Sequence, residues 1–204
     1  TPGHSSAASD VYKRQADFDG TAHTATAPVP LPSPYTLTGD TAWWDGDLCF
    51  TVSDRARLRL VCRVGRDRLS VFSDQDDAVV WDWKPAGSGV VALMAPSDAL
   101  PELVALRGRR ITPLTDVNPH AADWTMPRSR ITSWTAPDGT TVEGVLWLPA
   151  DWTEGDGPLP TVIHLHGGPT WSTHISFPGV ATAVYPARGW AVLSPNYRGS
   201  IGYG

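Results

Sequence analysis

The sequence lacks three features that would each assign the protein to a particular class. No apolar run approaches the roughly 18 residues that a transmembrane helix needs. Acidic residues outnumber basic ones by 21 to 16, a net charge of −5, whereas a nucleic-acid-binding surface requires a surplus of Lys and Arg. Two cysteines are too few for a disulfide-built scaffold. We therefore expect neither a membrane segment nor a nucleic-acid partner.

The two ends of the chain indicate a fragment truncated on both sides. It begins at Thr1 rather than Met, and it stops at Gly204 inside a glycine-rich stretch. Residues 1–15 include SSAASDVYKRQ, which resembles translated adapter sequence, so we predict an artefactual or disordered tail there. The N-terminus carries no apolar stretch of the signal-peptide type, and we predict a cytoplasmic location.

Short strands dominate the predicted structure of residues 16–128. A Thr-, Ala- and Pro-rich extended segment is followed, over residues 41–114, by apolar runs that turn residues separate. Spacing of about 8 to 12 residues without a helical period is typical of a sandwich or a propeller. Two four-stranded antiparallel units would fit in this stretch.

Residues 129–204 have the pattern of an α/β sheet. ITSWTAPDGTTVEGVLWLP predicts a hairpin that turns at Asp138-Gly139. PTVIHLHGG follows as an apolar run of the kind that is buried on both faces of a parallel sheet. A helix is expected over 180–188, ending at Gly189 and disturbed by Pro186, before the strand WAVLSPN. The order strand, helix, strand indicates a change of architecture near residue 130.

The segment with the clearest chemistry is HLHGGP, directly after the predicted buried strand. Loops at the carboxyl ends of such strands are where open α/β sheets place their sites. Gly167 and Gly168 let the backbone turn sharply, so that their amides point at developing negative charge. Pro169 has no N–H and is expected only to shape the loop. A purely structural turn is the alternative.

Three segments together resemble one enzyme family. DGTTVEGVLWLP, PTVIHLHGGP and ARGWAVLSPNYRGSIGYG match, in order and spacing, the start of the catalytic domain of the prolyl oligopeptidase family of serine peptidases. The similarity is greatest to its acylaminoacyl-peptidase and dipeptidyl-peptidase-like members. The strand-rich region upstream looks like the last blades of the family's β-propeller. The implied fold is a C-terminal propeller part (16–128) followed by the N-terminal part of an α/β-hydrolase domain (129–204).

The resemblance also implies roles for individual residues. The oxyanion-hole glycine of the family falls on Gly168, with Gly167 and His166 beside it, and Arg198 matches an arginine that braces the site. The family's G-x-S-x-G nucleophile and its Asp and His are not in the sequence, so we expect the triad beyond Gly204 and an inactive fragment. The implied activity is hydrolysis of short peptides through an acyl-enzyme, with no cofactor and no metal.

Two other functions stay open at this point. An esterase or lipase of the same fold is one, although such enzymes usually carry HGGG or HGGA and no propeller. A non-catalytic, binding-only propeller protein is the other. The sequence leaves the oligomeric state and the choice of peptide bond undetermined.

Several other residues could be given functional roles, but we favour structural roles for them. His164 and His166 alternate on a strand, but no further metal ligands lie near them in sequence. Cys49 and Cys62 would face each other across a hairpin turning at residues 55–56, and we predict two buried thiols rather than a disulfide. Acidic and aromatic clusters are interpreted as a solvated turn and as core packing, respectively: Asp74, Asp76 and Asp77; Trp43, Trp44, Trp81 and Trp83.

Overall fold

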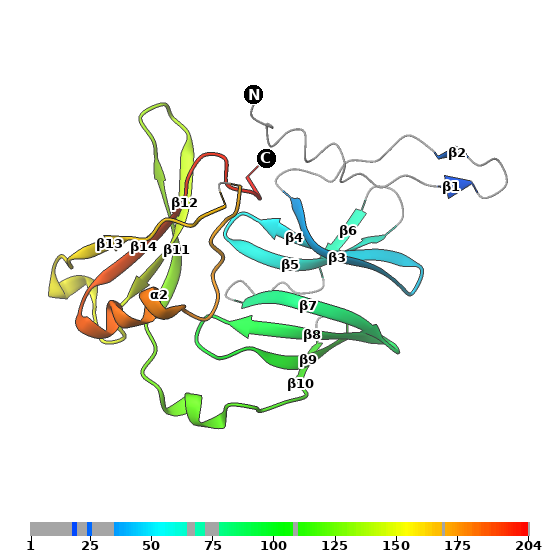
Figure 1. Cartoon of the computed structure of the whole chain (residues 1–204), viewed down its shortest axis with the longest axis horizontal. Coiled ribbons are helices and arrows are strands. Elements are labelled where there is room, and N and C mark those ends of the chain that lie inside the picture. The colour runs from blue at the N-terminus through cyan, green and yellow to red at the C-terminus, as the bar shows by residue number, and fades with distance from the viewer. Residues whose placement is uncertain are drawn as a thin grey trace.

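The chain folds mainly as antiparallel β-sheet with few helices. The structure is a computed structural model, and it describes residues 18–19, 24–25, 35–64, 68–71, 78–107, 110–168 and 170–203. Within these residues the strands form three four-stranded sheets and a two-stranded ribbon (Figure 1). The ribbon is β1 (Phe18–Asp19) with β2 (Thr24–Ala25). The predicted tail, residues 1–15, lies outside the described residues, as do Asp74, Asp76 and Asp77.

The first four-stranded sheet, called here the first quartet, is a meander. Its strands are β3 (Thr36–Trp44), β4 (Asp47–Asp54), β5 (Arg57–Val64) and β6 (Arg68–Val71), in that order. The β3–β4 hairpin turns at Asp45 and Gly46, whose φ angles of 52° and 83° are the pair of positive values that a tight two-residue turn of the favoured hand needs.

The second quartet repeats this arrangement. It contains β7 (Ala78–Ala86), β8 (Gly89–Pro96), β9 (Glu102–Arg107) and β10 (Arg110–Pro113), and each strand pairs with the next along the chain. Two four-stranded antiparallel units were predicted for this region, and both are present. Because every connection joins sequence neighbours, the alternation of apolar runs and turn residues was sufficient to predict them.

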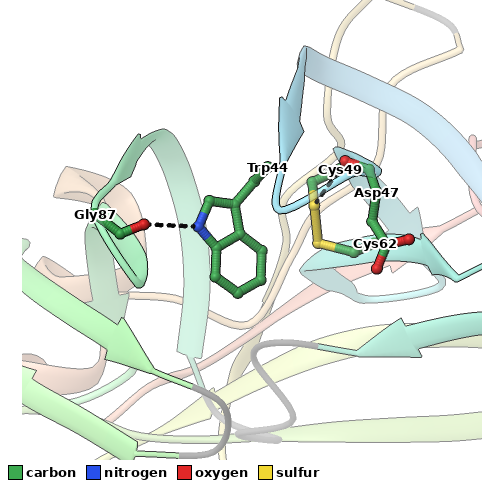
Figure 2. Close-up of a disulfide and its surroundings, with 5 residues drawn as sticks. All are labelled: Trp44, Asp47, Cys49, Cys62 and Gly87. Atoms are coloured by element: carbon green, nitrogen blue, oxygen red, sulfur yellow. Dashed lines mark hydrogen bonds between the residues drawn. A yellow bond between two sulfur atoms is a disulfide. The ribbon is translucent and has the colours of Figure 1, made fainter.

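The two quartets share one hydrophobic core. Cys49, Leu60 and Cys62 of the first pack against a set of buried side chains of the second, comprising Ala78, Val80, Trp83, Val90, Ala92, Met94, Val104 and Leu106. The predicted core role holds for Trp83, which is 2% exposed, and is wrong for Trp43 and Trp81, which are 66% and 43% exposed. Trp44 is half-buried and donates from its indole nitrogen to the carbonyl oxygen of Gly87, 3.3 Å away, so it links the quartets (Figure 2).

Cys49 and Cys62 form a disulfide in this core, and the prediction of two free thiols is wrong (Figure 2). The predicted pairing of the two residues across the β4–β5 hairpin is confirmed. Counted from the closing pair Asp54–Arg57, the cysteines occupy a non-hydrogen-bonded position, where side chains of opposite strands approach most closely. Their Cα atoms are 3.9 Å apart. The register thus places the two sulfur atoms within bonding distance.

Reduction of this disulfide is expected to lower the free energy of unfolding by about 3 kcal/mol, because the unfolded chain regains the freedom of a loop of this size. The cysteines are separated by 13 residues. Urea unfolding with and without a phosphine reductant measures the difference. The double variant Cys49→Ala, Cys62→Ala should not respond to the reductant. Equal stability of the oxidised and the fully reduced wild-type chains would contradict the prediction.

The third sheet, called here the mixed sheet, contains β11 (Arg128–Thr135), β12 (Thr141–Leu148), β14 (Ala191–Asn196) and β13 (Thr161–Ile163), in that order. The predicted β11–β12 hairpin and the parallel pairing of β13 with β14 are both present. Burial of β13 on both faces was predicted wrongly. β13 pairs only with β14 among the described strands, so it lies at the edge, and Ile163 is 57% exposed.

Short helices complete the chain. The predicted helix is a single turn, α2 (Val180–Val184), which continues as the 3₁₀-helix η3 (Pro186–Arg188) because Pro186 cannot donate a helical hydrogen bond. Gly189 ends it with φ of 80°, as predicted. Two further 3₁₀-helices are η1 (Pro119–Asp123) and η2 (Glu154–Asp156). No helix of the described residues is long and apolar enough to cross a membrane.

The β4–β5 turn joins the first quartet to the mixed sheet. Ala56 is fully buried in a second core with Val145, Trp147, Ile175 and Val192. Its carbonyl oxygen accepts from the Ile175 amide at 2.9 Å, and the neighbouring Arg55 amide donates to the Gly202 carbonyl oxygen, also at 2.9 Å. The loops that follow β13 and β14 are therefore held against the turn of a distant hairpin.

Candidate functional site

The first part of the site is the glycine loop, residues 164–168, which follows β13. The His164 amide still pairs with the Leu193 carbonyl oxygen of β14 at 2.9 Å, and the chain then leaves the sheet. Gly168 has φ of 64°, a left-handed conformation that side chains disfavour, and its carbonyl oxygen accepts from the Trp171 amide at 2.8 Å. Gly167 and Gly168 are exposed. Pro169 lies outside the described residues.

The second part is the arginine loop, residues 197–203, which follows β14. The carboxyl ends of β13 and β14 meet at one edge because the two strands are parallel, so the two loops lie side by side. A turn from Tyr197 to Ser200 opens the arginine loop, with the Ser200 amide donating to the Tyr197 carbonyl oxygen at 3.0 Å. Gly199 has φ of 92° within this turn.

His166 connects the two loops. Its ring stacks on the ring of Tyr197, with centroids 4.4 Å apart and planes inclined by 11°. Its Nε2 lies 2.9 Å from the Ser200 hydroxyl, which is also within 2.7 Å of the Tyr197 carbonyl oxygen. Sequence reasoning grouped His166 with Gly167 and Gly168 as neighbours in one loop. In the structure its side chain instead contacts Tyr197 and Ser200 of the arginine loop.

Arg198 extends from the arginine loop to the β11–β12 turn. Its guanidinium donates to the Asp138 carboxylate and to the Thr140 hydroxyl, the latter at 3.1 Å. The hydrogen bond from Arg198, assisted by the Thr140 amide, lowers the pKa of Asp138 from 3.8 to about 2. Asp138 was predicted only as a turn residue, so its ionic partner was missed.

A buried polar cluster that the sequence did not reveal joins Ser53 of β4 to Ser172 and His174, which follow the glycine loop along the chain. His174 Nε2 is 3.0 Å from the Ser53 hydroxyl and 3.1 Å from the Ser172 hydroxyl, and the two hydroxyls are 3.3 Å apart. All three residues are buried. Burial foremost, and then the charge of His166, lower the pKa of His174 from 6.5 to about 4. The cluster binds the end of β4 to residues 172–174.

Acidification is therefore expected to destabilise the fold through His174. Between about pH 6.5 and pH 4 the unfolded chain binds a proton at this residue that the folded chain does not. The contribution is fully present above pH 6.5 and is lost progressively toward pH 4, by about 3 kcal/mol in total. Urea midpoints measured from pH 4 to 7 test this. His174→Gln should flatten the profile, while His120→Gln, at an exposed histidine, should leave its slope unchanged.

A cavity of about 490 Å³ opens beside the glycine loop rather than at it. It lies between the β11–β12 hairpin and the arginine loop, and Trp134, Arg198 and Tyr203 are among its lining residues. The Tyr203 hydroxyl accepts from the Asn196 side chain at 2.9 Å, and burial raises the pKa of Tyr203. Gly167 and Gly168 do not line this cavity, so it is separate from the glycine amides.

The described part of the chain contains no group of three or more His, Cys, Asp or Glu side chains placed to hold a metal ion. His164 and His166 make other contacts. The His164 Nδ1 atom lies 3.2 Å from the buried Ser194 hydroxyl, and His166 is bound as described above.

The comparisons with known proteins give matches at the level of structure. A scan against protein-family models and a search of curated proteins find no match. An acylaminoacyl peptidase in complex with Z-Gly-Gly-Phe-chloromethyl ketone superposes with a TM-score of 0.76 at 18% identity, over 94% of this chain and 29% of that one. The uncomplexed acylaminoacyl peptidase of Pyrococcus horikoshii gives 0.75 at 16% identity, over the same 94% and 29%.

A puromycin hydrolase superposes with a TM-score of 0.64 at 22% identity, over 94% of this chain and 31% of that one. The chain thus spans less than a third of the length of the proteins it matches. The chain has the fold of the segment, less than a third of the whole, over which it superposes on acylaminoacyl peptidases and related prolyl oligopeptidase-family enzymes. The resemblance in its sequence had indicated the same family.

Proposed function

We propose that this chain supplies the oxyanion-binding part of a serine peptidase that hydrolyses short peptides. The observation that carries the proposal is the pair of exposed glycines after β13, with Gly168 at φ of 64°, in the fold shared with the acylaminoacyl peptidases. We assign the two quartets, within residues 16–128, to the end of a β-propeller. The mixed sheet, within residues 129–204, is assigned to the start of an α/β-hydrolase domain.

In the proposed reaction a serine attacks the peptide carbonyl carbon, and a histidine takes the serine's proton and then passes it to the leaving amine. The carbonyl oxygen becomes an oxyanion, which the Gly168 amide stabilises by donating a hydrogen bond. One such donor contributes roughly 10²- to 10³-fold to the rate. The sequence contains no G-x-S-x-G motif, so the nucleophile would come from residues outside the printed sequence, and the 204-residue chain alone is expected to be inactive.

The experiment compares two substrate classes on a polypeptide that carries this chain together with a G-x-S-x-G segment. Hydrolysis of acylaminoacyl anilides, with labelling by a fluorophosphonate, would support the peptidase. Hydrolysis of p-nitrophenyl esters alone would identify an esterase instead. Absence of both turnover and labelling would identify a binding module. The 204-residue chain is the matched negative control, because it carries the glycines without the nucleophile.

The disulfide bears on where this protein works. A cytoplasmic location was predicted from the N-terminal residues, whereas disulfides persist in oxidising compartments and are rare in the cytosol. The Cys49–Cys62 bond therefore weighs against the cytoplasm. Alkylation of the native protein at the moment of lysis, followed by mass spectrometry, decides between the two. Alkylation of both cysteines would indicate a reducing compartment, and an intact bond would indicate an oxidising one.

A further inference from the structure

Two side chains hold the two peptide groups of the glycine loop in fixed orientations. The first is Tyr197, whose hydroxyl donates to the His166 carbonyl oxygen at 2.7 Å. A trans peptide group is planar, with its C=O and N–H pointing in opposite directions. Because this carbonyl oxygen points at the Tyr197 hydroxyl, the Gly167 amide of the same peptide group points away from Tyr197.

The second is His166, which acts on the next peptide group. Its Nδ1 atom lies 3.1 Å from the Gly167 carbonyl oxygen. A carbonyl oxygen can only accept, so Nδ1 carries the proton in this contact. The Gly167 carbonyl oxygen thus points at the imidazole, and the Gly168 amide points away from it. The carbonyl oxygens of His166 and Gly167 both contact the stacked pair of Tyr197 and His166. The amides of Gly167 and Gly168 therefore both point away from this pair.

The stack itself is fixed from a third direction. The Ser200 hydroxyl is 2.9 Å from Nε2 of His166, and Ser200 is only 7% exposed. The nearly parallel rings of His166 and Tyr197 leave the imidazole little freedom to rotate. Gly168 has no side chain to restrict its backbone, and its neighbourhood is open, with Trp171 Cβ 3.9 Å from the position of a Cβ. The orientation of the two amides is therefore restrained by Tyr197 and His166, which bind the carbonyl oxygens of the same two peptide groups.

We propose that Tyr197 and His166 are positioning residues that aim the amides of Gly167 and Gly168 together at the site of the oxyanion. The inference rests on the proposed function for its catalytic consequence. It explains how both glycine amides expected from the sequence are held in one direction, and it gives Tyr197 and Ser200 roles that the sequence did not indicate. Neither Tyr197 nor Ser200 needs to touch the substrate to affect the rate.

The test uses variants that release one peptide group at a time. Tyr197→Phe keeps the ring stack and removes only the hydroxyl, which donates to the His166 carbonyl oxygen at 2.7 Å and lies 3.3 Å from Nδ1 of His166. It should change the orientation of the Gly167 amide more than that of the Gly168 amide. His166→Leu should change that of the Gly168 amide. His166→Asn should restore it in part, because its amide nitrogen stands where Nδ1 stood. Tyr185→Phe is the matched control, since Tyr185 is exposed beside Trp190 at the end of α2.

Residual dipolar couplings of the two glycine N–H groups, measured on the ¹⁵N-labelled 204-residue chain, report the orientations directly. In a polypeptide that also carries the nucleophile, Tyr197→Phe should lower kcat about tenfold to a hundredfold, with KM within twofold of wild type. Unchanged couplings in Tyr197→Phe, or altered couplings with an unchanged kcat, would overturn the inference. If the wild-type polypeptide neither turns over peptides nor binds a fluorophosphonate, the proposed function fails, while the couplings still decide whether these side chains orient the amides.

Discussion

Replacing Gly202 with alanine is expected to lower the free energy of unfolding by about 4 kcal/mol. Gly202 has φ of 87°, a left-handed conformation that costs a residue with a side chain about 1–2 kcal/mol. The added Cβ would also stand 2.5 Å from the Ser53 hydroxyl oxygen and 2.9 Å from the Arg55 amide nitrogen. Crowding of this kind costs about 1–3 kcal/mol, and here one of the two neighbours is backbone that cannot rotate away.

Gly199→Ala is the matched control that separates backbone strain from the crowding of the Gly202 Cβ against Ser53 and Arg55. Gly199 has φ of 92°, so it carries the same conformational strain. Apart from its two chain neighbours, however, no atom in the described part of the chain lies within 4 Å of the position its Cβ would take. Its replacement should cost only the conformational part, about 1–2 kcal/mol. Urea unfolding of both variants and the wild type measures the difference. Equal losses in the two variants would show that strain alone matters and that the approach of Gly202 to Ser53 does not.

The effect of Gly202→Ala should extend to the candidate site. The contact it breaks holds the arginine loop against the β4–β5 turn, since the Arg55 amide donates to the Gly202 carbonyl oxygen. Ser53, in the same place, binds His174 beyond the glycine loop. The first quartet thus supports the arginine loop directly and contacts residues 172–175, which follow the glycine loop. We expect the couplings of the Gly167 and Gly168 amides to change in Gly202→Ala and to persist in Gly199→Ala.

Local signals in the sequence were sufficient for most of the strands. Asp138-Gly139 predicted the β11–β12 turn, and Gly189 predicted where the helical segment formed by α2 and η3 ends. Both predictions were possible because the range of backbone conformations open to a residue is a property of that residue. The facing of Cys49 and Cys62 followed from the position of the turn. Their bond did not follow, because oxidation depends on how near the two sulfur atoms are brought and on the compartment, neither of which the residue pattern records. β13 was predicted as buried because its residues are apolar, whereas burial depends on how many strands pair with it.

Residue types alone pointed to the candidate site only where its residues are consecutive, whereas Arg198 was added by the family resemblance. Gly167 and Gly168 stand together in the sequence and were proposed as site residues for that reason. The residues around them come from other elements: Tyr197, which contacts the His166 carbonyl oxygen, follows a different strand. Ser53, which contacts His174 in the segment after the glycine loop, belongs to a hairpin more than a hundred residues away from it. No periodicity links such residues, because their proximity arises from packing of the first quartet against the mixed sheet. A buried histidine with two hydroxyl partners leaves no signature in one sequence.

Replacing Trp83 with alanine is expected to lower the free energy of unfolding by about 4 kcal/mol, which is typical of a large side chain removed from a packed core. Trp83 is 2% exposed and lies in the core that the two quartets share, in the same cluster as the disulfide. Alanine would leave a cavity there that β-sheets on both sides cannot collapse to fill. Because the lost contacts belong to both quartets, the two should unfold together rather than one after the other.

Two variants separate the parts of this effect. Trp81→Ala, on the same strand but 43% exposed, should cost less than about 1 kcal/mol, since its ring fills no core volume. Trp83→Phe should cost far less than Trp83→Ala, because the buried indole N–H of Trp83 has no hydrogen-bond partner among the described residues and its removal relieves that penalty. Urea unfolding monitored by near-ultraviolet circular dichroism gives all three values. A loss for Trp81→Ala as large as that for Trp83→Ala would mean that the exposed face of β7 is packed in the folded protein and that the shared core is not the main source of the quartets' stability.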